Sequence, residues 1–403
     1  MTDLSVNNYN IPRESYIRIF LRFLKFGLLA WGGPVAQIAM IRQELVEDEK
    51  WIPPERFNRA LAVYQVLPGP EAHELCVYFG MLAGGRIGAF LAGLGFMLPG
   101  FALMFLLSWF YVTVGISSPL FQAVFLGMQP AVAALVVRAA HRIGGHALHD
   151  HRWLWGIALG AALAQLLGVN FLIILLAAGI IYALWEIKLT KAAFGVSALF
   201  AVGLALTAFG VLPLPGLQSG ITAQASTGSP SVMQLLFYGL RAGLLTFGGA
   251  YTVIPFLQHD AVNVGGWMTN AQFLDGIALS GLLPAPLIIF STFVGYIGAG
   301  AWGAIAMTLG IFAPAFLFTM VGHDYLERLV EKKSAHAFLD GVTSGVVGLI
   351  GATALGILNQ TIIGIQAWAI FALALVILFR SSAKWTVVAI VLGAGLYGIL
   401  FLQ

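Results

Sequence analysis

Four long stretches of this chain carry no charged residue, and they constrain its fold more than any other feature. They cover residues 87–137, 153–185, 192–240 and 385–403. Apolar runs of 18 or more residues are typical of helices that span a bilayer. A transmembrane barrel would instead alternate apolar and polar residues in segments of about ten. We therefore expect an all-α, polytopic membrane protein embedded in a lipid bilayer.

Composition narrows the classes of function. Charged residues make up 9% of the 403 residues, and the net charge of +3 predicts no nucleic-acid partner. The single cysteine, Cys76, excludes an intrachain disulfide and a cysteine-cluster metal site. We find neither a GxxxxGK[ST] nucleotide loop nor a dinucleotide fingerprint. We expect no metal, no cofactor and no enzyme activity, so that any active transport is driven by an ion gradient.

The chain repeats itself at an offset of 216 residues. The segment "KFGLLAWGGP" at 25–34 matches "RAGLLTFGGA" at 241–250, and "LPGP" at 67–70 matches "LPAP" at 283–286. The same offset pairs Trp51 with Trp267 and Gly84 with Gly300. Ordered matches in series indicate two homologous halves. We place the first at 1–212, including extra spans, and the second at 213–403.

The number of membrane crossings in the first half determines whether the two halves have the same or opposite orientation in the bilayer. Spans are predicted at about 87–113, 118–138, 153–168, 170–186 and 192–212, after a polar N-terminus that has no signal peptide. Lys and Arg in short loops mark the cytoplasmic side and place this N-terminus inside. Five crossings are odd, which predicts inverted-topology repeats as in many secondary transporters. The alternative is a parallel duplication, which needs an even number.

Two segments in each half fit the charge rule only if they turn back inside the membrane. If residues 17–41 crossed fully, the basic loop 42–59 would lie outside. We therefore expect broken or re-entrant helices, in which 17–46 folds at "WGGP" and 57–83 at "LPGP". The second half would fold likewise at "FGGA" and "LPAP". The alternative is full crossings, about 13 in all.

Breaks of this kind make anion sites. Non-helical backbone at membrane depth is tolerated only where protein or water surrounds it. The N-terminus of a half-helix presents free N–H donors and about half a positive charge. We expect the four breaks to converge as the substrate-binding site. Its predicted backbone residues are Gly32, Gly33, Pro34, Pro68, Gly69, Pro70, Gly248, Gly249, Pro284 and Pro286.

Two equivalent cations accompany the breaks. Lys25 and Arg241 each precede a Gly-Gly pair by seven residues, or two helical turns. An intramembrane cation is expensive and marks a functional site by default. A symmetric pair suits a dianion, so we include both in the predicted substrate site. The alternative is that each extends to the membrane interface or neutralises a carboxylate.

Ionisable residues follow only one of the breaks. Glu71, His73 and Glu74 lie in the first turn after Pro70, whereas the second half has Leu287, Ile289 and Phe290 there. Such asymmetry fits a single site that couples proton movement to the anion. The alternative is helix capping together with a salt bridge.

The motifs themselves resemble the chromate transporter family. The segment "FGLLAWGGPVAQIAMIRQELVEDEKWIPPERF" precedes "LPGPEAHELCVYFGMLAGGRIGAFLAGLGFMLPGF" in the first half. The second half has "GLLTFGGAYTVIPFL" and "GWMTNAQFLDGIALSGLLPAPL". The resemblance runs from about residue 17 to the end and is to the long-chain, two-domain bacterial form. The family's GGP motif falls on residues 32–34 and its PGP motif on residues 68–70. Ala250 and Ala285 depart from this pattern in the second half.

The resemblance implies export of chromate, a tetrahedral oxyanion, across the bacterial plasma membrane, and so chromate resistance. Sulfate is the natural look-alike, and a sulfate transporter is the first alternative. A passive anion channel is a second, a membrane chromate reductase a third and a structural scaffold the last. A homodimer is the assembly we consider. Proton coupling by antiport is the mechanism we expect.

Overall fold

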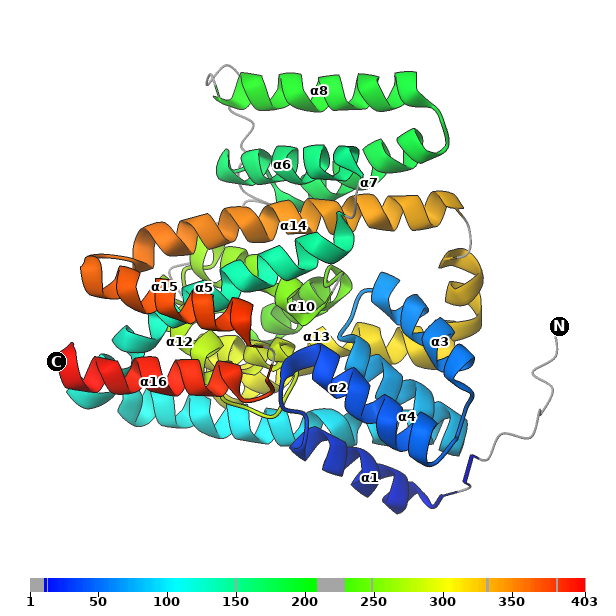
Figure 1. The fold of residues 1–403 in the computed structure, drawn as a ribbon, viewed down its shortest axis with the longest axis horizontal. Coiled ribbons are helices and arrows are strands. Elements are labelled where there is room, and N and C mark those ends of the chain that lie inside the picture. Colours follow the sequence, from blue (N-terminus) through cyan, green and yellow to red (C-terminus); the bar gives the residue numbers. More distant parts are fainter. Residues whose placement is uncertain are drawn as a thin grey trace.

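The structure, a computed structural model, describes residues 11–402 except 13, 149–150, 209–228, 248, 331–332 and 382. Every regular element among these residues is helical (Figure 1), as predicted. The first part of the chain forms α1 (Tyr16–Leu28), α2 (Gly33–Arg42), η1 (Gln43–Asp48), α3 (Pro54–Val66), α4 (Glu71–Phe110), η2 (Tyr111–Gly115), α5 (Pro119–Ala147), α6 (Arg152–Leu166), α7 (Phe171–Glu186) and α8 (Thr190–Ala208).

The second part repeats this order with small changes. It forms α10 (Val232–Leu244), η3 (Ala250–Thr252), α11 (Val253–Gln258), η4 (His259–Val264), α12 (Asn270–Gly281), η5 (Leu287–Ile289), α13 (Phe290–Val330), α14 (Lys333–Thr361), α15 (Ile365–Arg380) and α16 (Thr386–Phe401). The predicted spans match the later part of α4 and α5 to α8 closely, and residues 209–212 of the last predicted span lie outside the described residues. The exception is α5, which continues to Ala147 instead of ending near residue 138.

The helices have the length and surface of a membrane protein. Among the residues that the structure describes, four helical stretches are long and apolar enough to cross a bilayer: Glu71–Gly115, Pro119–Gly145, Leu287–Gly322 and Ser334–Thr361. Large apolar side chains stand on the outside, with Trp302 70% and Val321 74% exposed. Contiguous apolar surface is rare on soluble proteins. This surface is stable against lipid, and the chain is a multi-pass membrane protein.

The helix α4 doubles back on itself. Its backbone leaves helical geometry at Gly84 and Gly85, and Gly85 has a φ of 60° that favours glycine. A Cβ on Gly80 would lie 2.4 Å from the Cβ of Ala92. Residues twelve apart in a straight helix are about 18 Å apart. Residues 71–83 and 86–110 are therefore the two arms of an antiparallel hairpin.

The same hairpin recurs in α13. Ala299 and Gly300 leave helical geometry, and Gly300 again has a φ of 60°. A Cβ on Gly303 would lie 2.2 Å from the carbonyl oxygen of Gly295 across the turn. The backbone matches Gly300 with Gly85. A constant offset of 216 would pair Gly300 with Gly84 instead. The segment from "LPAP" to its hairpin turn is therefore one residue shorter than the segment from "LPGP" to its hairpin turn.

Each hairpin packs against the first helix of its own half. The helix α1 packs on α4, and α10 packs on α13. A Cβ on Gly27 would lie 2.4 Å from the carbonyl oxygen of Phe96, and one on Gly243 would lie 2.4 Å from that of Ile311. Glycine thus allows equally close backbone contact at equivalent places in both halves, as helices in lipid require.

Helices of each half also pack against helices of the other half. The helix α5 packs on α15 and α16, while α14 packs on α6 and α7. Glycines again make the contacts close: a Cβ on Gly127 would lie 2.3 Å from the carbonyl oxygen of Ala394, and one on Gly341 would lie 2.5 Å from that of Ala178. In Figure 1, α8 lies at the periphery, beyond α6 and α7. The halves form one packed unit, and their inverted sidedness stays a prediction.

Candidate functional site

The break after α3 meets the break after α10. The backbone N–H of Gly69 donates to the carbonyl oxygen of Thr246 at 2.9 Å. Thr246 is fully buried, and its own hydroxyl donates to the carbonyl oxygen of Ala242 at 2.6 Å. This backbone hydrogen bond joins "LPGP" of the first half to the residue just before "FGGA" in the second half. We call this region the junction, and it consists of Gly69, Pro70, Thr246, Gly249 and the side chains that contact them.

A third break belongs to the same region. The turn η3, which follows Gly249, packs against η5, which follows Pro286. Pro284 and Pro286 are buried. A Cβ on Gly100 would lie 2.5 Å from the Cβ of Ala285, between these two prolines. The "LPAP" break therefore lies against the long arm of α4.

The fourth break contacts a different part of the chain. Gly32 is exposed, and a Cβ on it would lie 2.9 Å from the Cβ of Lys384. The rings of Trp31 and Trp385 are 4.7 Å apart. Gly33 and Pro34 begin α2 beside this contact. The two Gly-Gly breaks therefore have different surroundings, because Gly249 is buried in the junction and Gly32 faces the turn before α16. Gly248 lies outside the described residues.

Glu71 places a carboxylate in the junction. Pro70 is the N-cap of α4, and Glu71 is the first helical residue. The Glu71 Oε1 atom lies 3.6 Å from the position of a Cβ on Gly249. Its Oε2 atom is buried and makes no hydrogen bond within the described chain. A carboxylate of the first half therefore lies directly against the Gly-Gly break of the second half.

Glu74 and His73 are both fully buried, one turn into α4. Neither oxygen of Glu74 has a hydrogen-bond partner among the described residues, and its Oε1 lies 2.9 Å from the position of a Cβ on Gly69. His73 has the backbone of Gly93 nearby, but neither ring nitrogen has a partner at hydrogen-bonding geometry. Its ring lies 4.7 Å from that of Phe316. Buried groups without partners are costly and point to a role beyond stability.

Sequence reasoning missed a cation beside these acids. The helix α5 continues through residues that were predicted to form a cytoplasmic loop, and it carries Arg138 and Arg142. The Arg142 guanidinium lies 5.5 Å from the centre of the Tyr251 ring, and Tyr251 belongs to the turn η3 that follows Gly249. The sequence does contain a signal for this continuation: Arg138 and Arg142 are one helical turn apart and directly follow the apolar run, so they can lie on one face of the same helix.

The two predicted cations, Lys25 and Arg241, form equivalent ion pairs. Lys25 Nζ lies 3.2 Å from Glu44 Oε1, and Arg241 pairs with Asp260. An offset of 216 converts the first pair into the second. Each pair links the helix before a break to the segment after it. The side chain of Lys25 is 59% exposed, whereas that of Asp260 is 2% exposed. This arrangement matches the alternative that each cation neutralises a carboxylate, and the predicted anion contact stays a prediction.

A second buried carboxylate lies outside the junction. Asp275 of α12 accepts hydrogen bonds from the Tyr111 hydroxyl at 2.8 Å and from Gln129 Nε2 at 3.0 Å. Both of its oxygens are therefore satisfied, in contrast to Glu74. Its partners are more than 140 residues away, so no local pattern indicates this network.

A multi-pass helical protein with charged side chains buried where its helices are interrupted has the construction of a membrane transporter. The sequence matches the chromate transporter family over residues 17–184 and 233–399. The chain belongs to that family, whose members are transporters and not enzymes. The two matched segments fall one in each predicted half, whose boundaries stay a prediction.

Similar proteins cover almost the whole chain. It is 53% identical to a chromate transport protein of Pseudomonas aeruginosa over 96% of this chain and 92% of the relative. It is 30% identical to a chromate transport protein of Cupriavidus metallidurans, over 97% and 94%. A probable chromate transport protein of Synechococcus elongatus is 28% identical, over 97% and 96%. No solved structure matches this chain.

Proposed function

We propose that this protein is a secondary active transporter that exports chromate across the bacterial plasma membrane and so confers resistance to it. The junction carries the proposal. There the N-terminus of α4, the buried Gly249 and the Glu71 carboxylate lie together, and the Arg142 guanidinium lies beside Tyr251 of the adjoining turn η3. Membership in the chromate transporter family and relatives named for chromate transport support the choice of substrate.

In this proposal the oxyanion binds the same positive groups that attract the Glu71 carboxylate. The first N–H groups of α4 and the charge of Arg142 attract negative charge. Glu71 and Glu74 compete for the same attraction, and two like charges that share a buried site disfavour each other's ionised form. Protonation of Glu71 would free the positive groups for the anion. Proton uptake and anion binding are therefore coupled in this proposal, with His73 and Glu74 as further proton carriers.

The membrane potential favours export of a dianion. Moving one charge through 100 mV changes its free energy by about 2.3 kcal/mol. A dianion leaving a cell with a negative interior therefore gains about 4.6 kcal/mol per 100 mV. Because the proton and the anion bind together in this mechanism, one proton would leave with each anion, and the coupling proposed here is symport instead of the antiport expected from the sequence. The exported charge is then −1, and the gain is about 2.3 kcal/mol per 100 mV.

The arrangement of the breaks supports alternating access. We propose that the halves are inverted repeats with re-entrant hairpins, and that the N-terminus is cytoplasmic. Side-chain contacts across "LPGP" and "WGGP" support chain reversal at both: the rings of Phe57 and Phe79 are 6.3 Å apart, and Lys25 pairs with Glu44. Gly249 is buried, whereas its equivalent in the first half, Gly33, is partly exposed. Such asymmetry is what rocking of one repeat against the other would produce. Assembly as a homodimer is a further prediction.

The decisive experiment is chromate flux in proteoliposomes with an imposed pH gradient of each sign. We expect uptake or release to follow the pH gradient at zero membrane potential. A channel would conduct chromate without responding to the pH gradient, and that result would refute the coupled mechanism. Competition by sulfate identifies the preferred substrate. A sulfate transporter would bind sulfate more tightly than chromate, so a low concentration of sulfate would already inhibit chromate flux.

A further inference from the structure

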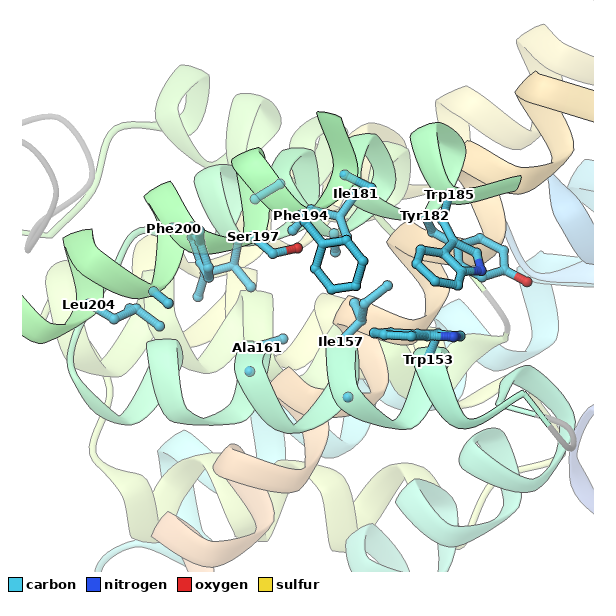
Figure 2. A pocket seen from close by; sticks show the side chains of 17 residues that line it. Trp153, Ile157, Ala161, Ile181, Tyr182, Trp185, Phe194, Ser197, Phe200 and Leu204 are labelled. Carbon is cyan, nitrogen blue, oxygen red and sulfur yellow. The ribbon is translucent and has the colours of Figure 1, made fainter. Parts of the chain in front are cut away.

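A cavity lies between α6, α7 and α8, away from the junction (Figure 2). Its volume is about 260 Å³, and its walls are almost entirely apolar. Figure 2 shows Trp153, Tyr182 and Trp185 at one end, with Phe200 and Leu204 toward the other. The helix α8 packs chiefly on α7. The groove between α8 and α6 is therefore left for another apolar group to fill.

The length of the groove indicates what fills it. On α8 the lining runs from Ala193 to Leu204, and on α7 from Ile174 to Trp185. Each stretch is about 16 Å long at 1.5 Å per residue. The hydrocarbon core is about 30 Å thick, so the groove spans one leaflet. A transmembrane helix of a second copy would need the full thickness, whereas an acyl chain of one lipid needs half of it.

The aromatic end of the groove, at Trp153 and Trp185, has the composition of a membrane interface. The rings of Trp153 and Trp185 lie 4.1 Å apart, and the ring of Phe194 lies 5.8 Å from each. Trp and Tyr concentrate where hydrocarbon meets headgroups. The aromatic cluster therefore marks the headgroup end, and Leu204 marks the end at the bilayer midplane.

Basic side chains surround the headgroup end. Arg152, Lys188 and Lys191 are exposed at the helix termini that meet there. Glu186 is exposed at the same end, and Asp340 nearby is paired with His336. The three bases outnumber the one unpaired acid among the described residues. Lys and Arg beside a membrane surface attract anionic headgroups.

We infer that this groove binds one acyl chain of an anionic phospholipid, whose headgroup lies against Arg152, Lys188 and Lys191. The bound chain completes the packing of α8 against α6 and α7. Because α8 packs chiefly on α7, the lipid would hold the peripheral three-helix layer together as a unit. The inference is independent of the transported substrate.

Native mass spectrometry of the full-length protein in detergent tests it, with phosphatidylglycerol and phosphatidylcholine of identical acyl chains as probes. Gly156→Leu and Gly160→Leu fill the groove, and a Cβ on either glycine meets no atom within 4 Å. Gly203→Leu on α8 is the control, because it has the same free space but does not line the groove. We expect the two groove variants to reduce bound phosphatidylglycerol at least tenfold, and the control to change it less than twofold.

A triple variant tests the contact between the headgroup and the three basic side chains. Arg152→Gln, Lys188→Gln and Lys191→Gln together should reduce the preference for phosphatidylglycerol by up to about a hundredfold, since each base near the surface contributes about fivefold. Equal binding of both lipids by the unaltered protein would overturn the inference. Unchanged lipid binding in Gly160→Leu would also overturn it. A shift in oligomeric state in that variant without lipid loss would identify a second copy of the chain as the occupant.

Discussion

Among single residues, Glu71 has the most direct test. Replacing it by Gln removes the charge and keeps the size. We expect the chromate affinity of the unaltered protein to fall as pH rises, because ionised Glu71 competes with the anion for Arg142 and the α4 terminus. Glu71→Gln should weaken this pH dependence, measured by flux at varied substrate concentration over a pH range in which chromate stays a dianion. Glu55→Gln, at an exposed position on α3, is the control and should keep the pH dependence.

Arg241 and Lys25 occupy equivalent positions but should differ in their effect on stability. Arg241→Ala leaves the buried Asp260 carboxylate without its partner, which costs about 3–5 kcal/mol. Lys25→Ala breaks an exposed pair and should cost at most about 1 kcal/mol. Thermal unfolding in detergent measures both, and equal losses would contradict the prediction.

A second substitution separates the two roles of Arg241. Adding Asp260→Asn to Arg241→Ala removes the unpaired charge and should restore most of the lost stability. Chromate resistance is then measured in cells with equal amounts of protein in the membrane. Restored resistance would identify Arg241 as the partner of Asp260 alone. Restored stability with lost resistance would identify a direct contribution to anion binding.

At the scale of elements, the hairpins in α4 and α13 depend on contact between their arms. A Cβ on Gly88 would lie 2.4 Å from the carbonyl oxygen of Gly80. Gly88→Ala should therefore push the arms apart and cost about 1–3 kcal/mol. Gly356→Ala on α14 is the control, since its Cβ meets no atom within 4 Å, and alanine should stabilise that helix by about 1 kcal/mol. Unfolding temperatures compare the two, and a neutral Gly88→Ala would contradict the hairpin contact.

For the whole molecule, the inverted arrangement makes opposite predictions for two equivalent loops. Asp48 and Asn263 are both exposed, one after each Gly-Gly break. In the proposed topology Asp48→Cys is labelled by an impermeant thiol reagent from the cytoplasmic side, and Asn263→Cys from the other side. The native Cys76 is fully buried and gives little background. Labelling of position 48 only from outside would rule out the re-entrant hairpins.

Much of this protein follows from the sequence because its main signals are local. Apolar runs set the positions of α5 to α8, since lipid leaves only helices as solutions for such segments. The repeated Gly and Pro motifs locate the breaks, because these residues alter backbone geometry wherever they occur. The asymmetry of Glu71, His73 and Glu74 between the halves is likewise a property of the amino-acid sequence alone.

Tertiary structure decided which of these features meet. The bond from Gly69 to Thr246 and the contact of Glu71 with Gly249 join residues about 180 apart in the chain. Arg142 reaches the junction because α5 continues as a helix past its apolar run. Glu44 and Asp260 neutralise Lys25 and Arg241 because the chain reverses between them. Contacts of this kind depend on how helices pack, which no local pattern encodes. The sequence by itself therefore determined the helices and their breaks, and the packing of the two halves determined the site.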